Sequence, residues 1–305
     1  MKAQKPPCCL IGAGRAGSAL AKAMSNRGFH FDWIVSRNKE KVAELARTVK
    51  APLSGDSIAD MPQISGILII AVSDKDITSV AKEVAEADII VGAETVALHL
   101  SGALGPEALS ALADRGVATL AFHPGQTFTL DSDHHSVFND VVFDMEGDDR
   151  ACRTGHDIAE LLGATSVVLN REQRVIVHTA MSMASNYTAA LLTLSENLIL
   201  TTGCSIDSAR AMLAPLVKNT VSNCFESGPI AALTGPVARG DINVIHDHLT
   251  ALDVLDTDTG ELYRLMGRIA AKIALKRGSI SAETAEKLTQ EFGNEQDSSS
   301  SQNKV

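Results

Sequence analysis

Apolar and polar positions follow two recurring patterns through the first 170 residues. Short apolar runs of four to seven residues are typical of buried strands, and the longer stretches between them repeat apolar residues at the spacing of an amphipathic helix. The predicted strands are residues 8–11, 31–35, 66–72, 95–100, 118–122, 141–145 and 166–169. The predicted helices between them are residues 18–27, 39–49, 77–87, 106–115 and 151–162. Such alternation predicts an α/β domain with a doubly wound parallel sheet.

Strand patterns stop after residue 170, and the remainder of the chain has the periodicity of helices. The predicted helices are residues 172–202, 205–227, 242–253, 258–276 and 281–292. We therefore expect a first domain over residues 1–170 and an all-helical second domain over residues 171–292. Residues 293–305 are polar and rich in serine, which predicts a disordered tail.

A glycine-rich turn joins the first predicted strand to the first predicted helix. It reads Gly12-Ala13-Gly14-Arg15-Ala16-Gly17, the spacing of a dinucleotide-binding turn. Gly12 permits a tight turn, Gly14 lets the backbone approach a pyrophosphate, and Gly17 lets helix and strand pack closely. The start of the following helix offers free N–H groups to phosphate. These residues predict binding of a nicotinamide dinucleotide.

The end of the second predicted strand indicates which dinucleotide is bound. It reads Ser36-Arg37-Asn38, and no carboxylate follows before Glu40. An NAD site places a carboxylate there for the ribose 2′-hydroxyl, whereas an arginine accommodates the 2′-phosphate of NADP. Ser36 and Arg37 therefore favour NADP, with a solvated loop arginine as the alternative interpretation.

The composition limits which kinds of binding partner are expected. The net charge of −10 argues against nucleic acid or an anionic membrane surface as the main partner. The five cysteines form no CxxC pair, which is typical of a reducing compartment, and the start of the chain does not read as a signal peptide. His178, Asn186 and Glu196 interrupt the long apolar stretch 175–200, which suits a buried helix better than a membrane span. We expect a cytoplasmic protein with a small-molecule substrate.

Polar side chains follow several predicted strands at their carboxyl ends, where such sheets bind ligands. Val72 and Ser73 end one strand, Ser101 follows the next, and His123-Pro124 ends a third. Hydride transfer needs a proton donor or acceptor whose pKa lies near neutrality, which suits His123. Ser101 would orient the substrate oxygen or relay its proton. The alternative is that His123 only shapes its loop; for His99 we favour such a structural role.

Two further groups are candidates for substrate contact. His178, Ser182, Ser185 and Asn186 share one face of the long predicted helix, so they either face a substrate or find polar partners in the core. Arg239 lies in a compact turn and could clamp a carboxylate. The alternative there is a structural Arg239–Asp241 pair that starts the next helix.

No metal site is predicted. His134 and His135 lie in a polar stretch that reads as an exposed loop. His246 and His248 are two residues apart on a predicted helix and therefore point to different sides of it.

These motifs together resemble a family of Rossmann-like proteins whose C-terminal half is a domain of unknown function. The resemblance rests on residues 12–17, 99–105, 123–128, 185–187 and 233–241. The family is related to pyrroline-5-carboxylate reductase and the deazaflavin-dependent NADP reductases. The resemblance implies an α/β Rossmann doubly wound sheet followed by an all-α domain like the C-terminal domain of 6-phosphogluconate dehydrogenase. It also implies an NADP-dependent oxidoreductase that forms a homodimer through the long helix.

Two related families bear on the mechanism. His123-Pro124 is similar to the motif of prephenate dehydrogenases, whose histidine contacts the reacting hydroxyl. Hydroxyisobutyrate-type dehydrogenases carry a catalytic lysine on the long helix, followed by an asparagine. Here His178 stands near that region with Asn186 eight residues on and no lysine between them, which argues against straightforward β-hydroxyacid dehydrogenase chemistry.

The sequence supports two functions from different classes. The first is an NADP-dependent oxidoreductase acting on a small carboxylate-bearing carbonyl, hydroxyl or imine compound, with His123 or His178 as the acid/base. The second is a non-catalytic NADP-binding sensor or scaffold, which would need no proton donor beside the cofactor. The two histidine motifs and the polar helix face favour the oxidoreductase.

Overall fold

The computed structural model describes residues 5–90, 94–128, 136–255 and 257–293. The chain divides into two compact units, Met1–Thr188 and Ala189–Val305.

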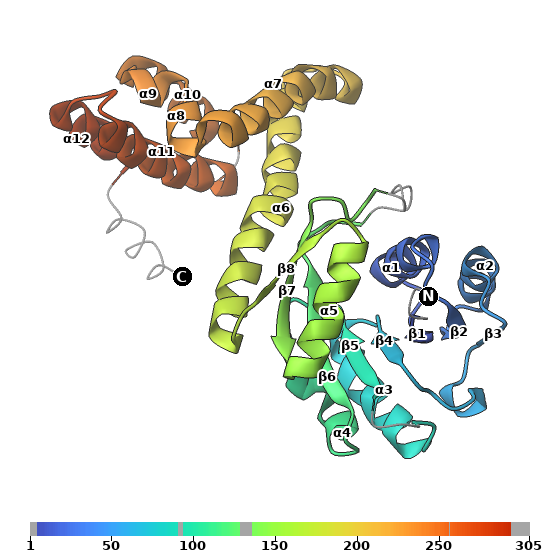
Figure 1. The fold of residues 1–305 in the computed structure, drawn as a ribbon. Coiled ribbons are helices and arrows are strands. Elements are labelled where there is room, and N and C mark those ends of the chain that lie inside the picture. Colours follow the sequence, from blue (N-terminus) through green and yellow to red (C-terminus); the bar gives the residue numbers. More distant parts are fainter. Residues whose placement is uncertain (1–4, 91–93, 129–135, 256, 294–305) are drawn as a thin grey trace, which may run out of the picture. The chain divides into compact units, whose positions relative to one another are not determined.

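The first unit is built on one eight-stranded sheet in the order β3-β2-β1-β4-β5-β6-β7-β8 (Figure 1). Its strands are β1 Cys8–Ile11, β2 Phe31–Val35, β3 Leu53–Gly55, β4 Ile67–Ile70, β5 Val96–His99, β6 Ala118–Pro124, β7 Val142–Gly147 and β8 Thr165–Val168. Neighbouring strands run parallel except β6 and β7, which are antiparallel. The predicted doubly wound α/β fold is confirmed.

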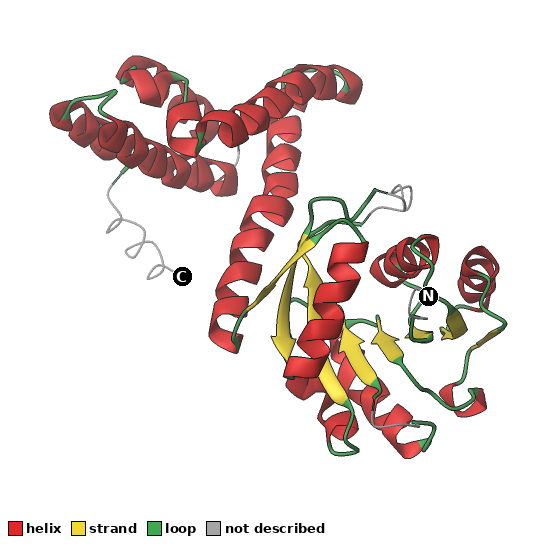
Figure 2. Cartoon of the chain, viewed as in Figure 1, coloured by secondary structure: helices red, strands yellow, loops and turns green. Residues whose placement is uncertain are grey.

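Helices cover both faces of this sheet, as Figure 2 shows. One buried cluster joins the sheet to α1 Arg15–Asn26, α2 Lys39–Val49 and α5 Asp149–Leu161. A second cluster joins its other face to α3 Asp74–Glu86 and the short α4 Ser110–Ala113, with 3-10 turns at Ile58–Asp60 and Pro106–Leu109. The central strands are buried on both sides, which explains their uninterrupted apolar runs.

The reversed direction of β7 departs from the predicted parallel sheet. Parallel strands need a crossover connection, and the described residues between β6 and β7 form no helix that could supply one. The chain instead returns along β6, and α5 then crosses over so that β8 runs parallel to β7. This reversal places His123 directly opposite Asp144 in the strand register.

The predicted elements recur with small shifts in their ends. Strands β1 and β2 and the helices over residues 39–49 and 242–253 begin and end at the predicted residues, and most other predicted elements differ by up to three residues. Strand β3 was missed because its three residues are exposed or half-buried and form no apolar run. The predicted helix 106–115 divides into a 3-10 turn and α4.

The long helix α6 Arg171–Leu200 begins in the first unit and continues into the second. The second unit then contains α7 Ile206–Ser227, α8 Pro229–Ala232, α9 Pro236–Arg239, α10 Ile242–Asp253, α11 Thr257–Arg277 and α12 Ala282–Glu291. Its core lies between α10, α11 and α12. The described residues after 170 contain no strand, as predicted.

The compact units divide inside α6 at Thr188, whereas the change from strands to helices falls at residue 170. The domain boundary at residue 170 therefore stays a prediction. Residues 294–305, nearly all of the predicted disordered tail, lie outside the described residues. Among the described helices, none is long and apolar enough to cross a membrane.

Candidate active site

Two glycines of the turn between β1 and α1 are required by the protein's own packing. Gly12 has φ +107°, and a Cβ there would lie 2.4 Å from the carbonyl oxygen of Ala71. A Cβ on Gly17 would lie 2.4 Å from the carbonyl oxygen of Gly12. Any side chain at either position would collide with backbone, so both glycines hold α1 close to β1 and β4.

Gly14 has no such packing reason. A Cβ built there would meet only the carbonyl oxygen of Ala71, at an ordinary 3.9 Å. Gly14 is also the N-cap residue of α1, and no side chain caps the first N–H groups of that helix. Arg15, Ala16 and Gly17 form its first turn. Free N–H groups beside an open backbone suit a phosphate, so this turn fits a dinucleotide.

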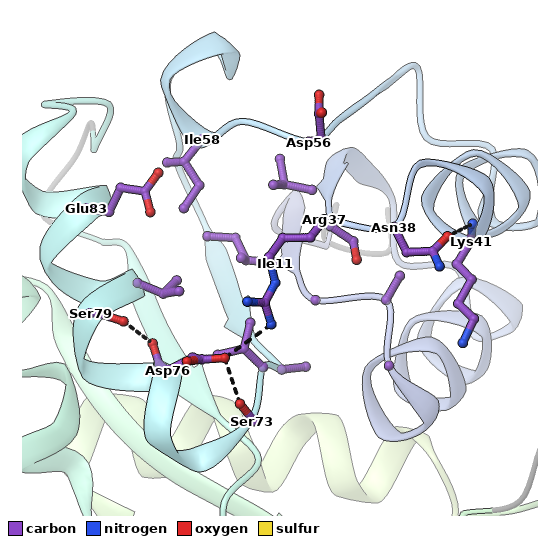
Figure 3. A pocket seen from close by; sticks show the side chains of 18 residues that line it. Ile11, Arg37, Asn38, Lys41, Asp56, Ile58, Ser73, Asp76, Ser79 and Glu83 are labelled. Carbon is purple, nitrogen blue, oxygen red and sulfur yellow. Dashed lines mark hydrogen bonds and ion pairs between the residues drawn. The ribbon is translucent and has the colours of Figure 1, made fainter.

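A cavity of about 500 Å³ lies beside this turn, at the carboxyl ends of β1, β2 and β4 (Figure 3). Seven of the predicted cofactor-binding residues line it, namely Gly12, Ala13, Gly14, Ser36, Arg37, Val72 and Ser73. The first turn of α1 is not part of the lining. Lys41 and Asp76 also line the cavity, and the sequence analysis singled out neither.

Arg37 reaches across the cavity mouth to α3. Its Nη2 lies 3.2 Å from Oδ2 of Asp76, which also accepts a 2.7 Å hydrogen bond from the Ser73 hydroxyl. The bond from Ser73 and the charge of Arg37 lower the pKa of Asp76, which stays ionised. Because the Arg37 side chain is 88% exposed, the pair is weak and can open. Figure 3 shows Arg37 turned toward Asp76 and the Lys41 ammonium group apart from both.

His99 at the end of β5 has a structural role, as predicted. The ring is buried; its Nδ1 accepts the Ser101 N–H at 3.2 Å, so its Nε2 donates to the carbonyl of Gly105 at 3.0 Å. Burial lowers the pKa of His99 and keeps the ring neutral. The Ser101 hydroxyl oxygen accepts the N–H groups of Ala103 and Leu104, both at 3.1 Å. Ser101 thus shapes the loop after β5 and keeps a hydroxyl proton to donate.

His123 at the end of β6 is held by a buried carboxylate. Its Nδ1 lies 2.7 Å from Oδ2 of Asp144 on β7, and the Asp144 side chain is 3% exposed. The other carboxylate oxygen of Asp144 accepts a 2.8 Å hydrogen bond from Nε of Arg174, which is fully buried in the first turns of α6. The remaining Arg174 nitrogens donate to the carbonyls of Ser101 and Leu104.

The charge state of Asp144 follows from these contacts. Burial alone would raise its pKa, but the hydrogen bonds from His123 and Arg174 and their charges outweigh burial, and the pKa is lowered. The carboxylate is therefore ionised at neutral pH.

Asp144 and Arg174 were not predicted from the sequence. A lone acid inside an otherwise apolar strand, Val-Val-Phe-Asp-Met, was the available signal, because a buried charge needs a partner.

A second histidine meets His123 at Gly102. The rings of His123 and His178 pack edge to face with centroids 5.3 Å apart. A Cβ on Gly102 would lie 2.9 Å from Nε2 of His123 and 2.5 Å from Nδ1 of His178. Nδ1 of His178 is buried and makes no hydrogen bond within the described residues. Gly102 therefore packs closely against both rings, and a side chain at this position would collide with them.

The remaining predicted residues are not joined to this cluster by any described contact. Ser182 is half-buried on α6, and Ser185 and Asn186 are exposed there. Arg239, in the second unit, donates from Nε to Asp241 at 2.9 Å, so the structural pair considered from the sequence is present. Roles for Ser182, Asn186 and Arg239 in catalysis or substrate binding stay predictions.

Within the described ranges, no three His, Cys, Asp or Glu side chains gather closely enough to hold a metal ion. His246 contacts Glu291 and His248 contacts the Tyr263 hydroxyl, each at 2.7 Å. His134 and His135 lie outside the described residues.

The fold defines the class: a Rossmann-like α/β domain followed by a helical region. Comparison with known families agrees with this description. Residues 2–124 match the Rossmann-like domain family, and residues 141–270 match the domain of unknown function DUF2520. The chain consists of a Rossmann-like domain followed by a DUF2520 domain, as the motifs predicted. A search of curated proteins gave no match.

Several solved structures share the fold. A proposed NADP oxidoreductase from Bacteroides fragilis is 26% identical, with a TM-score of 0.72 over 89% of this chain and 99% of that one. Pyrroline carboxylate reductase from Plasmodium falciparum, solved with NADP bound, is 13% identical, with a TM-score of 0.54 over 95% and 99% of the two chains. Prephenate dehydrogenase from A. aeolicus, solved with hydroxyphenyl propionate and NAD+, is 14% identical, with a TM-score of 0.57 over 92% and 100%. These neighbours are oxidoreductases of nicotinamide nucleotides or proposed as such.

Proposed function

We propose that this protein is an NADP-dependent oxidoreductase that transfers hydride to or from a small carboxylate-bearing carbonyl, hydroxyl or imine compound. One observation carries the proposal. The strands β1, β4, β5 and β6 are parallel neighbours, so their carboxyl ends share one edge of the sheet. That edge carries the glycine turn and its cavity at β1 and β4, and His123 at the end of β6. Cofactor residues and a proton donor thus belong to one rim.

The residues fit a dinucleotide phosphate in detail. The open backbone at Gly14 and the uncapped start of α1 would hold the pyrophosphate. Ser36, Arg37 and Lys41 line the cavity beyond β2 and would hold the 2′-phosphate, with Arg37 exchanging Asp76 for that phosphate. Val72 and Ser73 line the part of the cavity next to α3. When bound, the nicotinamide would supply or accept the hydride.

Side chains of the protein would donate and accept the proton. Asp144 accepts from Nδ1 of His123, so Nε2 is the nitrogen that exchanges a proton with the substrate oxygen or nitrogen. His178 and the Ser101 hydroxyl are further candidates for contact with that atom, and Ser182 and Asn186 extend the polar face of α6. Arg174 is occupied by Asp144 and backbone carbonyls, so it is not our candidate for binding the substrate carboxylate. The candidate for that role is still Arg239, as predicted from the sequence.

Nucleotide binding tests the cofactor assignment. We expect the wild type to bind NADPH at least about tenfold more tightly than NADH, and Arg37→Ala to remove most of that preference by weakening NADPH alone. Asp76→Asn should act in the opposite direction, since it frees Arg37 for the phosphate. Arg47→Ala is the matched control, because Arg47 is an exposed arginine of α2 that does not line the cavity. Calorimetric titration measures each affinity.

The outcomes separate the two function classes. No binding of either nucleotide would refute the oxidoreductase proposal. Equal affinities for NADPH and NADH in the wild type would refute the assignment of NADP. Tight NADPH binding without oxidation by any of a panel of small keto acids and cyclic imines would favour the sensor.

We also propose that the protein acts as a homodimer in the cytoplasm. All five cysteines are free thiols, as a reducing compartment would maintain them. On α6, Ile176, Met183 and Tyr187 follow each other at helical spacing on the side opposite His178, and they are 70%, 58% and 64% exposed. An exposed apolar stripe of this kind is typical of a protein contact, here with a second copy of the chain.

A further inference from the structure

A cross-strand carboxylate and a buried arginine together determine which nitrogen of His123 faces the reacting atoms. We propose that Asp144 and Arg174 are positioning residues that hold neutral His123 in the tautomer with its proton on Nδ1, leaving Nε2 as the nitrogen that exchanges the proton. This inference rests on the proposed function, because it concerns the acid/base assigned there.

The first step is the direction of the hydrogen bond. An ionised carboxylate only accepts hydrogen bonds, so the 2.7 Å contact between Oδ2 of Asp144 and Nδ1 of His123 requires the proton on Nδ1. A ring that carries its proton on Nδ1 leaves Nε2 unprotonated when neutral. Nε2 then accepts a proton from a hydroxyl group or, once protonated, donates one to a carbonyl or imine. In both directions the other proton stays on Nδ1 of His123, which donates it in the hydrogen bond to Asp144.

Arg174 keeps Asp144 ionised and oriented. Arg174 donates from Nε to Oδ1 at 2.8 Å, which leaves Oδ2 free for His123. Arg174 is in turn held by the carbonyls of Ser101 and Leu104. Oε2 of Glu146 lies 3.6 Å from Nη1 of Arg174 and adds a second carboxylate beside the guanidinium group. With its nitrogens engaged and no exposed surface, Arg174 cannot turn away from Asp144.

Nε2 of His123 is the ring nitrogen that remains open to a ligand. It makes no hydrogen bond within the described residues, and the His123 side chain is 16% exposed. The neighbouring Gly102 has no side chain that could cover this edge of the ring, since a Cβ there would lie 2.9 Å from both Nε2 and Cε1. Nε2 is therefore the nitrogen available to a polar substrate atom.

Asp144→Asn offers a sharp test because it should reverse the tautomer. The amide has one oxygen, which Arg174 will keep because its Nε–H needs an acceptor. The amide NH₂ group must then face His123 and donate to Nδ1, which moves the ring proton to Nε2. Glu146→Gln is the matched control, since it changes a neighbouring carboxylate beside the same arginine without touching His123.

The measurement is the ¹⁵N spectrum of histidine-labelled full-length protein at a pH of about 9, where an ordinary histidine is neutral. His123→Gln identifies the His123 signals among the nine histidines. We expect the Nδ1–H tautomer for His123 in the wild type and in Glu146→Gln, and the Nε2–H tautomer in Asp144→Asn. An Nε2–H ring in the wild type would overturn the proposal, even if the variant failed to fold. So would an unchanged tautomer in folded Asp144→Asn.

NADPH titration of the same samples separates this proposal from the proposed function. Positioning predicts equal NADPH affinity in wild type and Asp144→Asn, because Asp144 does not line the cofactor cavity. Loss of NADPH binding in the wild type would refute the proposed function and would leave the tautomer result to be judged separately. With a substrate in hand, Asp144→Asn should lower kcat by about 100-fold or more with little change in KM. A change confined to KM would contradict a positioning role.

Discussion

The residue that most constrains the site is Asp144, a carboxylate buried inside the first unit. Removing a charge from water costs several kcal/mol, and a buried ion pair is often no more stable than apolar residues of similar volume. The Asp144–Arg174 pair is therefore poorly explained by stability alone. Its contact with His123 gives a functional reason for keeping both charges in the core.

The lowered pKa of Asp144 predicts a pH-dependent stability. A carboxyl group whose pKa is lower in the folded state stabilises the fold above its unfolded pKa of about 3.9, and that contribution is lost as pH falls through the folded value. Asp144→Asn, which leaves Arg174 without its charge partner, should destabilise the first unit by about 2–4 kcal/mol at neutral pH. The difference in the free energy of unfolding between the wild type and Asp144→Asn should shrink as the pH falls below about 4.

Urea unfolding followed by tryptophan fluorescence measures this effect. Trp33, the single tryptophan of the chain, is fully buried on β2 and reports on the first unit. His123 and Arg174 contact the Asp144 carboxylate, and Glu146 lies beside the same arginine, so the Glu146→Gln control shows how much of the pH dependence belongs to Asp144. A wild-type advantage that stayed constant down to a pH of about 3 would contradict the assignment.

At the scale of elements, the strand–turn–helix unit β1–α1 contains two glycines that packing requires, Gly12 and Gly17, and one that packing does not require, Gly14. Gly17→Ala places a methyl group against the carbonyl of Gly12 and should cost about 1–3 kcal/mol of stability. Gly14→Ala meets no such obstacle, and as a poorer N-cap residue it should cost about 0.5–1 kcal/mol of stability. It narrows the phosphate cradle, however, so we expect NADPH affinity to fall by about tenfold or more.

Thermal unfolding and NADPH titration of the two variants check this contrast. A Gly14→Ala protein that binds NADPH as the wild type does would show that the open backbone is not a phosphate site. A Gly17→Ala protein as stable as the wild type would show that α1 can move away from β1.

At the scale of the whole molecule, α6 carries two different surfaces. One side contributes Arg174 and His178 to the cluster around His123, and the opposite side exposes Ile176, Met183 and Tyr187. The apolar stripe on the second side is the surface on which the proposed dimer contact rests.

Sedimentation equilibrium tests this assembly. We expect a dimer for the wild type and a monomer for the double variant Met183→Glu and Tyr187→Glu, because two charges would be buried in the contact. Lys82→Glu, at an exposed position of α3, controls for a change of surface charge. A wild-type monomer, or a dimer that survives both substitutions, would refute this surface as the contact.

The sequence by itself determined the features that depend on neighbouring residues. Local sequence patterns were enough to predict the buried strands β1 and β2, helix α2 and the glycine turn. Burial, helical periodicity and the need for glycine each produce a pattern within a few consecutive residues. The candidate His123 was found for the same reason, since it ends a strand of a sheet whose carboxyl edge binds ligands.

Only the tertiary structure decided the contacts between distant residues. His123 and Asp144 are 21 residues apart, Asp144 and Arg174 are 30 apart, and Arg37 and Asp76 are 39 apart. The first pair exists because β7 runs antiparallel to β6 in one particular register. Periodicity shows that a residue is buried, but strand order, strand direction and register decide which residue it meets, and these are properties of the assembled sheet.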